Sequence, residues 1–146
     1  MKQRLLVLGA LFFVTGLLAQ RVKPAALPAA VLEHFEKQFV GAKEAKWEKE
    51  GVYYEVEFEV GELEQSAVFD AAGNLIETEV DIAYTSLPAA VKEYLRATYG
   101  KAKIKEVTQI TDNKGSITYE VEVKGRDVLF DEKGQFLREV VILHED

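Results

Sequence analysis

The chain alternates between two hydrophobic periods, one typical of an α-helix and one typical of a β-strand. Apolar residues fall four positions apart from Leu27 to Phe39 and again from Leu87 to Tyr99, so each set forms one stripe of an amphipathic helix. Each stripe is followed by segments with alternating apolar and polar residues, such as residues 52–60 and 117–124. That alternation predicts antiparallel strands with one buried face and one solvent-exposed face.

Short motifs of the first half return in the second half. Three of them occur twice in the same order: Leu-Pro-Ala-Ala-Val at residues 27–31 and 87–91, Tyr-Glu-Val-Glu at 54–57 and 119–122, and Phe-Asp-x-x-Gly at 69–73 and 130–134. Because the order is kept and the offsets between copies are 60, 65 and 61 residues, the pattern indicates a tandem duplication of a unit of about sixty residues. The two repeats cover residues 26–84 and 85–146.

Glycines divide the alternating segments of each repeat into four strands. The corresponding turn glycines are Gly51, Gly61 and Gly73 in the first repeat and Gly115, Gly125 and Gly134 in the second. Glycine is favoured in hairpin turns that need a positive φ angle. The predicted fold class is therefore α+β: two tandem repeats of one helix plus a four-stranded antiparallel meander, with the two sheets side by side and the helices on one face.

The first nineteen residues have the pattern of a secretory signal peptide. Lys2 and Arg4 precede an almost uninterrupted apolar run over residues 5–18, and Ala19 offers a small residue for cleavage. A transmembrane anchor would need about 20 apolar residues. The prediction is a signal peptide over residues 1–19 and a single domain over 20–146, periplasmic or secreted, without stable membrane insertion after cleavage.

Charge and cysteine content narrow the possible partners. The chain carries a formal charge of −7, and removing Lys2 and Arg4 with the signal peptide leaves −9. Nucleic-acid binding depends on clusters of lysine and arginine, so this acidic domain is not expected to bind nucleic acid. There is no cysteine, which excludes disulfides and leaves core burial to stabilise the domain.

The repeated motifs give the chain a resemblance to a known family. Residues 26–143 resemble the PepSY-like proteins grouped with the β-lactamase-inhibitory protein, through the Leu-Pro-x-Ala-Val helix start, the Tyr-Glu-Val strand and the Phe-Asp-x-x-Gly hairpin. The resemblance implies a small exported domain of two helix-plus-four-strand repeats, typical of periplasmic proteins of Gram-negative bacteria. The inhibitory protein has disulfides and this chain has none, so inhibition of a lactamase is not carried over.

Catalytic side chains are scarce. None of the serines, Ser66, Ser86 and Ser116, lies in a Gly-x-Ser-x-Gly motif, and the histidines are His34 and His144. A nucleophile paired with a base has little to be built from. The sequence therefore predicts a protein that is not an enzyme and uses no cofactor.

The last predicted strand provides a candidate binding surface. When the repeats are aligned on the Phe-Asp-x-x-Gly turn, three acidic positions of the first repeat correspond to Arg138, Val140 and Ile142 of the second. An exposed apolar row on a sheet marks a contact surface, although neighbouring backbone could also bury it. The candidate protein-binding residues are Phe136, Arg138, Val140, Ile142 and Tyr53. The preferred function is an exported module whose open sheet face binds a protein or peptide, and the family resemblance suggests that it restrains a hydrolase.

An alternative function uses the acidic face of the first repeat. Its carboxylates are Glu55, Glu57, Glu59, Glu77, Glu79 and Asp81. Calcium prefers clustered oxygen ligands, so this face could belong to a periplasmic protein that binds a cation or a small ligand. Strands, however, space alternate side chains by nearly 7 Å and provide no loop to wrap an ion. The competing interpretation is that these residues keep the sheet soluble and discourage edge pairing.

Overall fold

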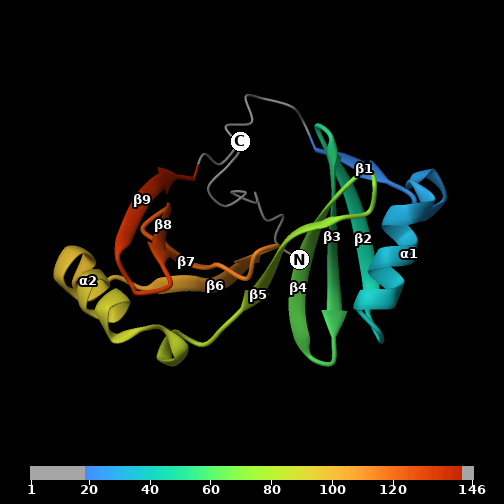
Figure 1. The fold of residues 1–146 in the computed structure, drawn as a ribbon. Coiled ribbons are helices and arrows are strands. Elements are labelled where there is room, and N and C mark those ends of the chain that lie inside the picture. The colour runs from blue at the N-terminus through green and yellow to red at the C-terminus, as the bar shows by residue number, and fades with distance from the viewer. Residues whose placement is uncertain (1–18, 143–146) are drawn as a thin grey trace.

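A computed structural model describes residues 19–142 of the chain as one curved antiparallel sheet with two α-helices (Figure 1). The elements are β1 (Gln20–Val22), η1 (Pro24–Ala26), α1 (Ala29–Gln38), β2 (Lys43–Glu50), β3 (Tyr53–Val60), β4 (Leu63–Asp70), β5 (Leu75–Asp81), η2 (Tyr84–Ser86), α2 (Ala89–Tyr99), β6 (Ile104–Asp112), β7 (Ile117–Val123), β8 (Arg126–Asp131) and β9 (Phe136–Val141). Residues 1–18 of the predicted signal peptide, and His144, lie outside the described residues. Within residues 19–142, neither helix has the length and apolar character needed to cross a membrane.

The predicted pair of side-by-side four-stranded sheets is wrong. A single sheet of nine strands runs in the order β1 to β9, and most of the structure is sheet rather than helix. β5 pairs directly with β6 from Glu77 opposite Asp112 to Asp81 opposite Thr108, so the two halves share one ladder. Pairing these two strands satisfies backbone groups that two separate sheets would have left at unpaired edges. The short strand β1, which no motif predicted, adds to β2.

The first hydrophobic core lies between α1 and the N-terminal half of the sheet. α1 buries Val31 and Phe35, which fall four positions apart on one stripe of the helix. The Phe35 ring lies 5.1 Å from the rings of both Trp47 on β2 and Phe58 on β3, in edge-to-face geometry. Such aromatic pairs add about 0.5–1.5 kcal/mol each beyond the area that they bury.

The second core lies beneath α2. There Val91 and Leu95 pack with Val121 of β7 and with Val128 and Phe130 of β8. Strand register places these residues on the same sheet face as the first core. Both helices consequently cover one face, and in Figure 1 they lie on the outer side of the curved sheet.

The Phe-Asp-x-x-Gly hairpins press against the start of each helix. Gly73 has a φ of +83°, and a Cβ placed there would lie 2.5 Å from the Ala30 carbonyl oxygen. Asp70 shapes the same turn, because its Oδ1 accepts hydrogen bonds of 2.9 Å from the backbone N–H groups of Ala72 and Asn74. The motif is therefore structural: it bends the hairpin and brings it against α1.

Candidate functional site: the acidic face of the sheet

Acidic side chains cover the sheet face opposite the helices. We call this surface the acidic face and define it by Glu55, Glu57, Glu77, Glu79, Glu120, Glu122 and Asp127. Glu55 and Glu77 stand on either side of Val68 across three neighbouring strands, while Glu57 and Glu79 stand on either side of Ser66. The sheet curves toward this face, so the acidic face lines its inner side (Figure 1).

Several carboxylates of the acidic face are buried. The exposed fraction is 8% for Glu55, 5% for Glu77 and Glu79, and 6% for Asp127. Val68, Ile110 and Leu129 are apolar residues buried on the same face. Sequence alternation correctly grouped Glu55, Glu57, Glu77 and Glu79 on one face. The expectation that this face is solvated is wrong at Glu55, Glu77 and Glu79, whereas Glu57 is half-buried. Acidic residues are seldom this buried.

Glu55 is the most perturbed group of the N-terminal half. Burial, together with the negative charges of Glu57, Glu48, Glu50 and Glu77, raises its pKa to about 8. Within the described part of the chain, its buried Oε1 atom has no hydrogen-bond partner. An isolated buried carboxylate is costly, and the group responds by holding its proton.

Glu120 is the corresponding group of the C-terminal half. Burial, with the negative charges of Asp127, Glu106 and Glu77, raises its pKa to about 8 against the opposing charge of Arg138. Its Oε2 also has no hydrogen-bond partner among residues 19–142. Burial and the negative charges of Glu122 and Glu106 likewise raise the pKa of Asp127 to about 6. These groups extend the acidic face beyond the residues proposed from sequence, although the alternation in residues 117–124 already placed Glu120 and Glu122 on one strand face.

The two halves of the acidic face act on each other through Glu77. Its charge raises the pKa of both Glu55 and Glu120, so one continuous electrostatic surface crosses the β5–β6 junction. Protonated carboxyl groups on this surface can donate hydrogen bonds, and ionised ones can bind a cation. Among the described residues, no group of three or more histidine or acidic side chains is arranged to hold a metal ion.

A groove of about 560 Å³ adjoins one end of the acidic face. It brings together three of the carboxylates proposed from sequence, Glu57, Glu59 and Asp81, with apolar residues such as Phe58 and Ile82. Lys46 and Lys105 line it as well, so the groove offers apolar contact beside charges of both signs.

The candidate residues of β9 do not all share one face. Arg138 stands opposite Leu129 and Val140 opposite Asp127, which places both on the acidic face. A β-bulge at Leu137 turns Phe136 to the helix side, where its ring stacks on Tyr94 at 5.2 Å. Tyr53 is half-buried at the start of β3, on the side of Glu55. Ile142 follows β9 and donates its backbone N–H to the Gly125 carbonyl.

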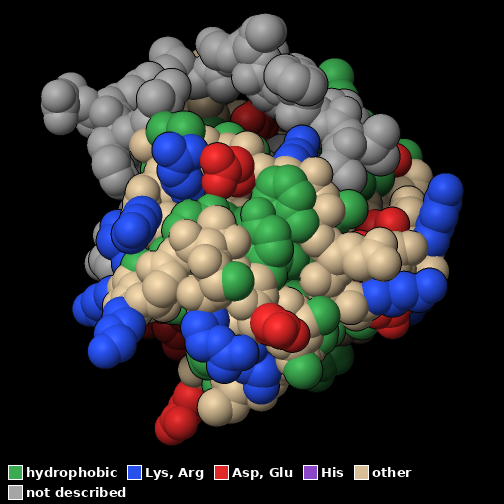
Figure 2. Space-filling model, turned by 90° about the vertical axis from the view of Figure 1, so that its left-hand side faces the viewer, with side chains coloured by type: hydrophobic (Ala, Val, Ile, Leu, Met, Phe, Trp, Pro, Cys, Tyr) green, Lys and Arg blue, Asp and Glu red, His purple; other side chains and the backbone are tan. Residues whose placement is uncertain are grey.

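The helix side of β9 carries the most exposed apolar residues of this strand. Phe136, Leu137 and Val141 are 43%, 50% and 54% exposed. Figure 2 shows hydrophobic side chains at the surface on this side of the molecule, with lysine and arginine side chains around them. The most exposed apolar residues of this strand therefore lie on the helix side, and not on the side of Val140 that the sequence analysis proposed for binding.

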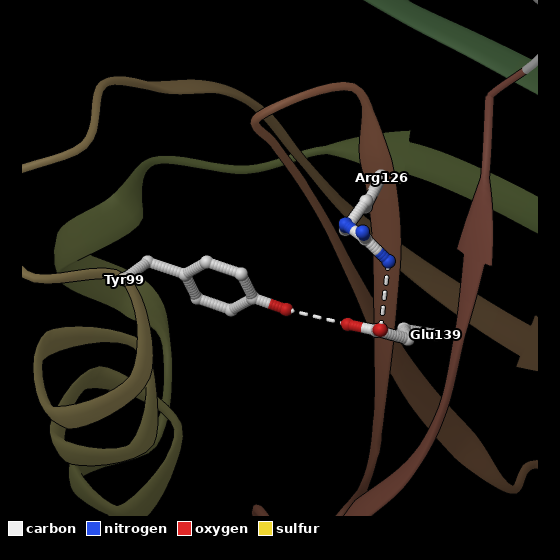
Figure 3. A network of polar contacts seen from close by, with 3 residues as sticks. All are labelled: Tyr99, Arg126 and Glu139. Carbon is white, nitrogen blue, oxygen red and sulfur yellow. Dashed lines mark hydrogen bonds and ion pairs between the residues drawn. The ribbon is translucent and has the colours of Figure 1, made fainter.

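A small polar network connects α2 to the same strand (Figure 3). The Tyr99 hydroxyl donates a 2.8 Å hydrogen bond to Glu139 Oε2, and Arg126 Nη1 donates to Glu139 Oε1 at 2.8 Å. Burial and the hydrogen bond to Glu139 raise the pKa of Tyr99 to about 12. Arg126 and Glu139 are both well exposed, so their ion pair contributes little, and the network mainly positions β9 beside α2.

The fold defines a small protein whose single antiparallel sheet has both helices on one face and an acidic opposite face. Residues 17–77 and 52–138 match the model of a family described as "Putative beta-lactamase-inhibitor-like, PepSY-like". The chain belongs to this PepSY-like family, as its repeated motifs suggested.

Solved structures with the same fold come from Bacteroides. A BLIP-like protein of Bacteroides fragilis is 28% identical, with a TM-score of 0.67 over 82% of this chain and 89% of that one. A protein of Bacteroides eggerthii described as a "putative periplasmic" protein is 20% identical, with a TM-score of 0.73 over 78% and 88%. A DUF2874 family protein of Bacteroides uniformis is 22% identical, with a TM-score of 0.70 over 77% and 88%. No curated protein matches the sequence.

Proposed function

We propose that this protein is an exported, non-enzymatic module that binds a protein or peptide on the acidic face of its sheet. The observation that carries the proposal is the concentration of buried carboxylates on the face that the helices leave uncovered. Burying this many like charges works against folding unless a partner compensates for them. Structural need alone does not account for such a surface, because an apolar or neutral face would be more stable.

The absence of an assembled catalytic pair favours a binding role. The sequence has no cysteine. Buried Ser66 directs its hydroxyl to Glu79 Oε2 at 3.5 Å, and the Nδ1 atom of His34 is hydrogen-bonded to the Gly73 carbonyl on the helix side. Within the described residues, these contacts leave no serine hydrogen-bonded to a histidine.

Export and a restraining role are supported by the comparisons. The signal-peptide pattern of residues 1–19 agrees with the periplasmic description of the relative from B. eggerthii. The inhibitor-like description of the family, together with the BLIP-like relative, favours restraint of a hydrolase as the result of binding. The cation-binding alternative lacks a convergent set of ligands in the part of the chain that the structure describes.

The test compares charge changes at the β9 end of the sheet with a charge change elsewhere on the surface. The protein is recovered from the periplasm after expression of the full chain. The immobilised protein is used to capture partners from periplasmic extract. Val140→Lys places positive charge at the β9 end of the acidic face, Ile142→Lys places it directly after β9, and Val40→Lys makes the same change at an exposed valine after α1. We expect the first two variants to lose the captured complex and the third to keep it. A complex that survives the first two changes, or that all three abolish equally, would disprove the proposed surface.

A further inference from the structure

We infer that the acidic face holds an arginine or lysine side chain of an extended partner segment, seated among Glu55, Glu57, Glu77 and Glu79. We call these residues the four-glutamate site. This inference rests on the proposed function and specifies the chemistry of the partner. The site lies on β3 and β5, and β4 runs between them as its floor.

The geometry of the strands determines what the site can hold. Glu55 and Glu57 are about 7 Å apart along β3, and two strand spacings place β5 about 9–10 Å from β3. Val68 and Ser66 of β4 form the floor between the two pairs of glutamates. A guanidinium presents five N–H donors in a planar fork, so it can bond to carboxylates on opposite sides of such a site.

Glu55 supplies the independent observation that points to a ligand. It is buried to more than nine-tenths, and its Oε1 atom has no hydrogen-bond partner within residues 19–142. A buried acceptor without a donor is destabilising until a donor arrives. A positively charged donor would satisfy this atom and offset the repulsion of the surrounding carboxylates.

Charge and shape favour a protein segment over an isolated ion. The domain carries −9 after loss of the predicted signal peptide, which attracts a cationic partner at long range. The acidic face continues past the four-glutamate site across β6 to β9, where half-buried Val140 offers apolar contact. A peptide with alternating cationic and apolar residues matches this succession of acidic and apolar side chains. Calcium, in contrast, would require six to eight convergent oxygens.

Binding should also depend on pH, because the site must lose protons to accept a cation. Glu55 faces Glu48 and Glu50 of β2, Glu57 of its own strand and Glu77 of β5, while Lys46 stands opposite Glu57. Burial and these negative charges raise the pKa of Glu55 to about 8. Affinity for a cation should consequently rise with pH between about 6 and 8, by up to tenfold per unit for one displaced proton, with proton release on binding.

The test is calorimetric titration of the exported protein with an end-blocked hexapeptide, Val-Arg-Val-Arg-Val-Arg. The same peptide with citrulline in place of arginine keeps the shape and loses the charge. We expect the arginine peptide to bind at least tenfold more tightly than the citrulline peptide, and Glu55→Gln to weaken arginine-peptide binding at least tenfold at pH 8. Glu62→Gln and Glu132→Gln remove the same charge at exposed positions outside the site, and they should change the affinity less than twofold.

Several outcomes would overturn the inference. Equal binding of the two peptides, no binding of either, or equal effects of Glu55→Gln and Glu132→Gln would each do so. Tighter binding of calcium than of the arginine peptide, abolished by Glu55→Gln, would assign the site to a metal instead. If the arginine peptide does not bind the four-glutamate site but capture from extract still depends on Val140, only this inference is disproved. If capture is also independent of Val140, the proposed function is disproved as well.

Discussion

Replacing Glu55 by glutamine should stabilise the protein at neutral pH, because glutamine has nearly the same shape and no charge to bury. The folded protein raises the pKa of Glu55 from 4.5 to about 8. Between these values the folded state binds more protons than the unfolded state, so the contribution of this group to stability falls as pH rises. At pH 7 the carboxyl is ionised in the unfolded chain and protonated in the folded protein, and this difference lowers the free energy of unfolding by about 3 kcal/mol, at about 1.4 kcal/mol per pH unit.

The expected difference between Glu55→Gln and the wild type is therefore close to zero at pH 4.5, about 3 kcal/mol in favour of the variant at pH 7, and about 4 kcal/mol at pH 8. Urea denaturation at several pH values measures it, with fluorescence of the buried Trp47, the chain's one tryptophan, as the signal. Glu132→Gln, at an exposed turn position, should stay within about 0.5 kcal/mol of the wild type. A pH-independent difference, or a destabilised Glu55→Gln variant at pH 7, would refute the reasoning.

Three further predictions concern export, the hairpin and the Tyr99 network. Mass spectrometry of the exported protein should show cleavage after Ala19, and a retained N-terminus would contradict the signal peptide. Gly73→Ala should destabilise the protein by about 2–4 kcal/mol, because the added Cβ would clash with α1 at a residue that already has a positive φ. Gly115→Ala, where the new Cβ meets no other atom, should cost about 1 kcal/mol. Equal losses of stability for the two variants in chemical denaturation would contradict the clash. Tyr99→Phe should cost about 0.5–1.5 kcal/mol, and thermal melts identical to the wild type would show that the bond to Glu139 contributes nothing.

Local features were predictable from sequence because their causes are local. The stripes containing Val31 and Val91 indicate the helices, and the structure begins α1 and α2 immediately after Pro28 and Pro88. Gly73 marks a turn that needs a positive φ, and the structure has one. The alternation of residues 52–60 assigned each side chain of β3 to the correct face, since strand periodicity depends only on neighbouring residues.

Long-range features were not predictable in the same way. Pairing of β5 with β6 joins residues about thirty positions apart, and no local pattern encodes whether two strand edges will meet. The bulge at Leu137 changes the face of Phe136, which strict alternation cannot reveal. Burial depends on residues that are distant in the sequence, so alternation could group the carboxylates but could not show that Glu55 is withdrawn from solvent.

The shared ladder between β5 and β6 has a consequence for how the chain tolerates cleavage. A protease cut in the connection between Asp81 and Ala89 would leave the strand pairing from Glu77–Asp112 to Asp81–Thr108 in place. The two fragments would then present complementary edges, and they should remain associated or recombine after separation, as in a split reporter. The two halves of the chain are thus held together by backbone hydrogen bonds between β5 and β6 as well as by the covalent connection.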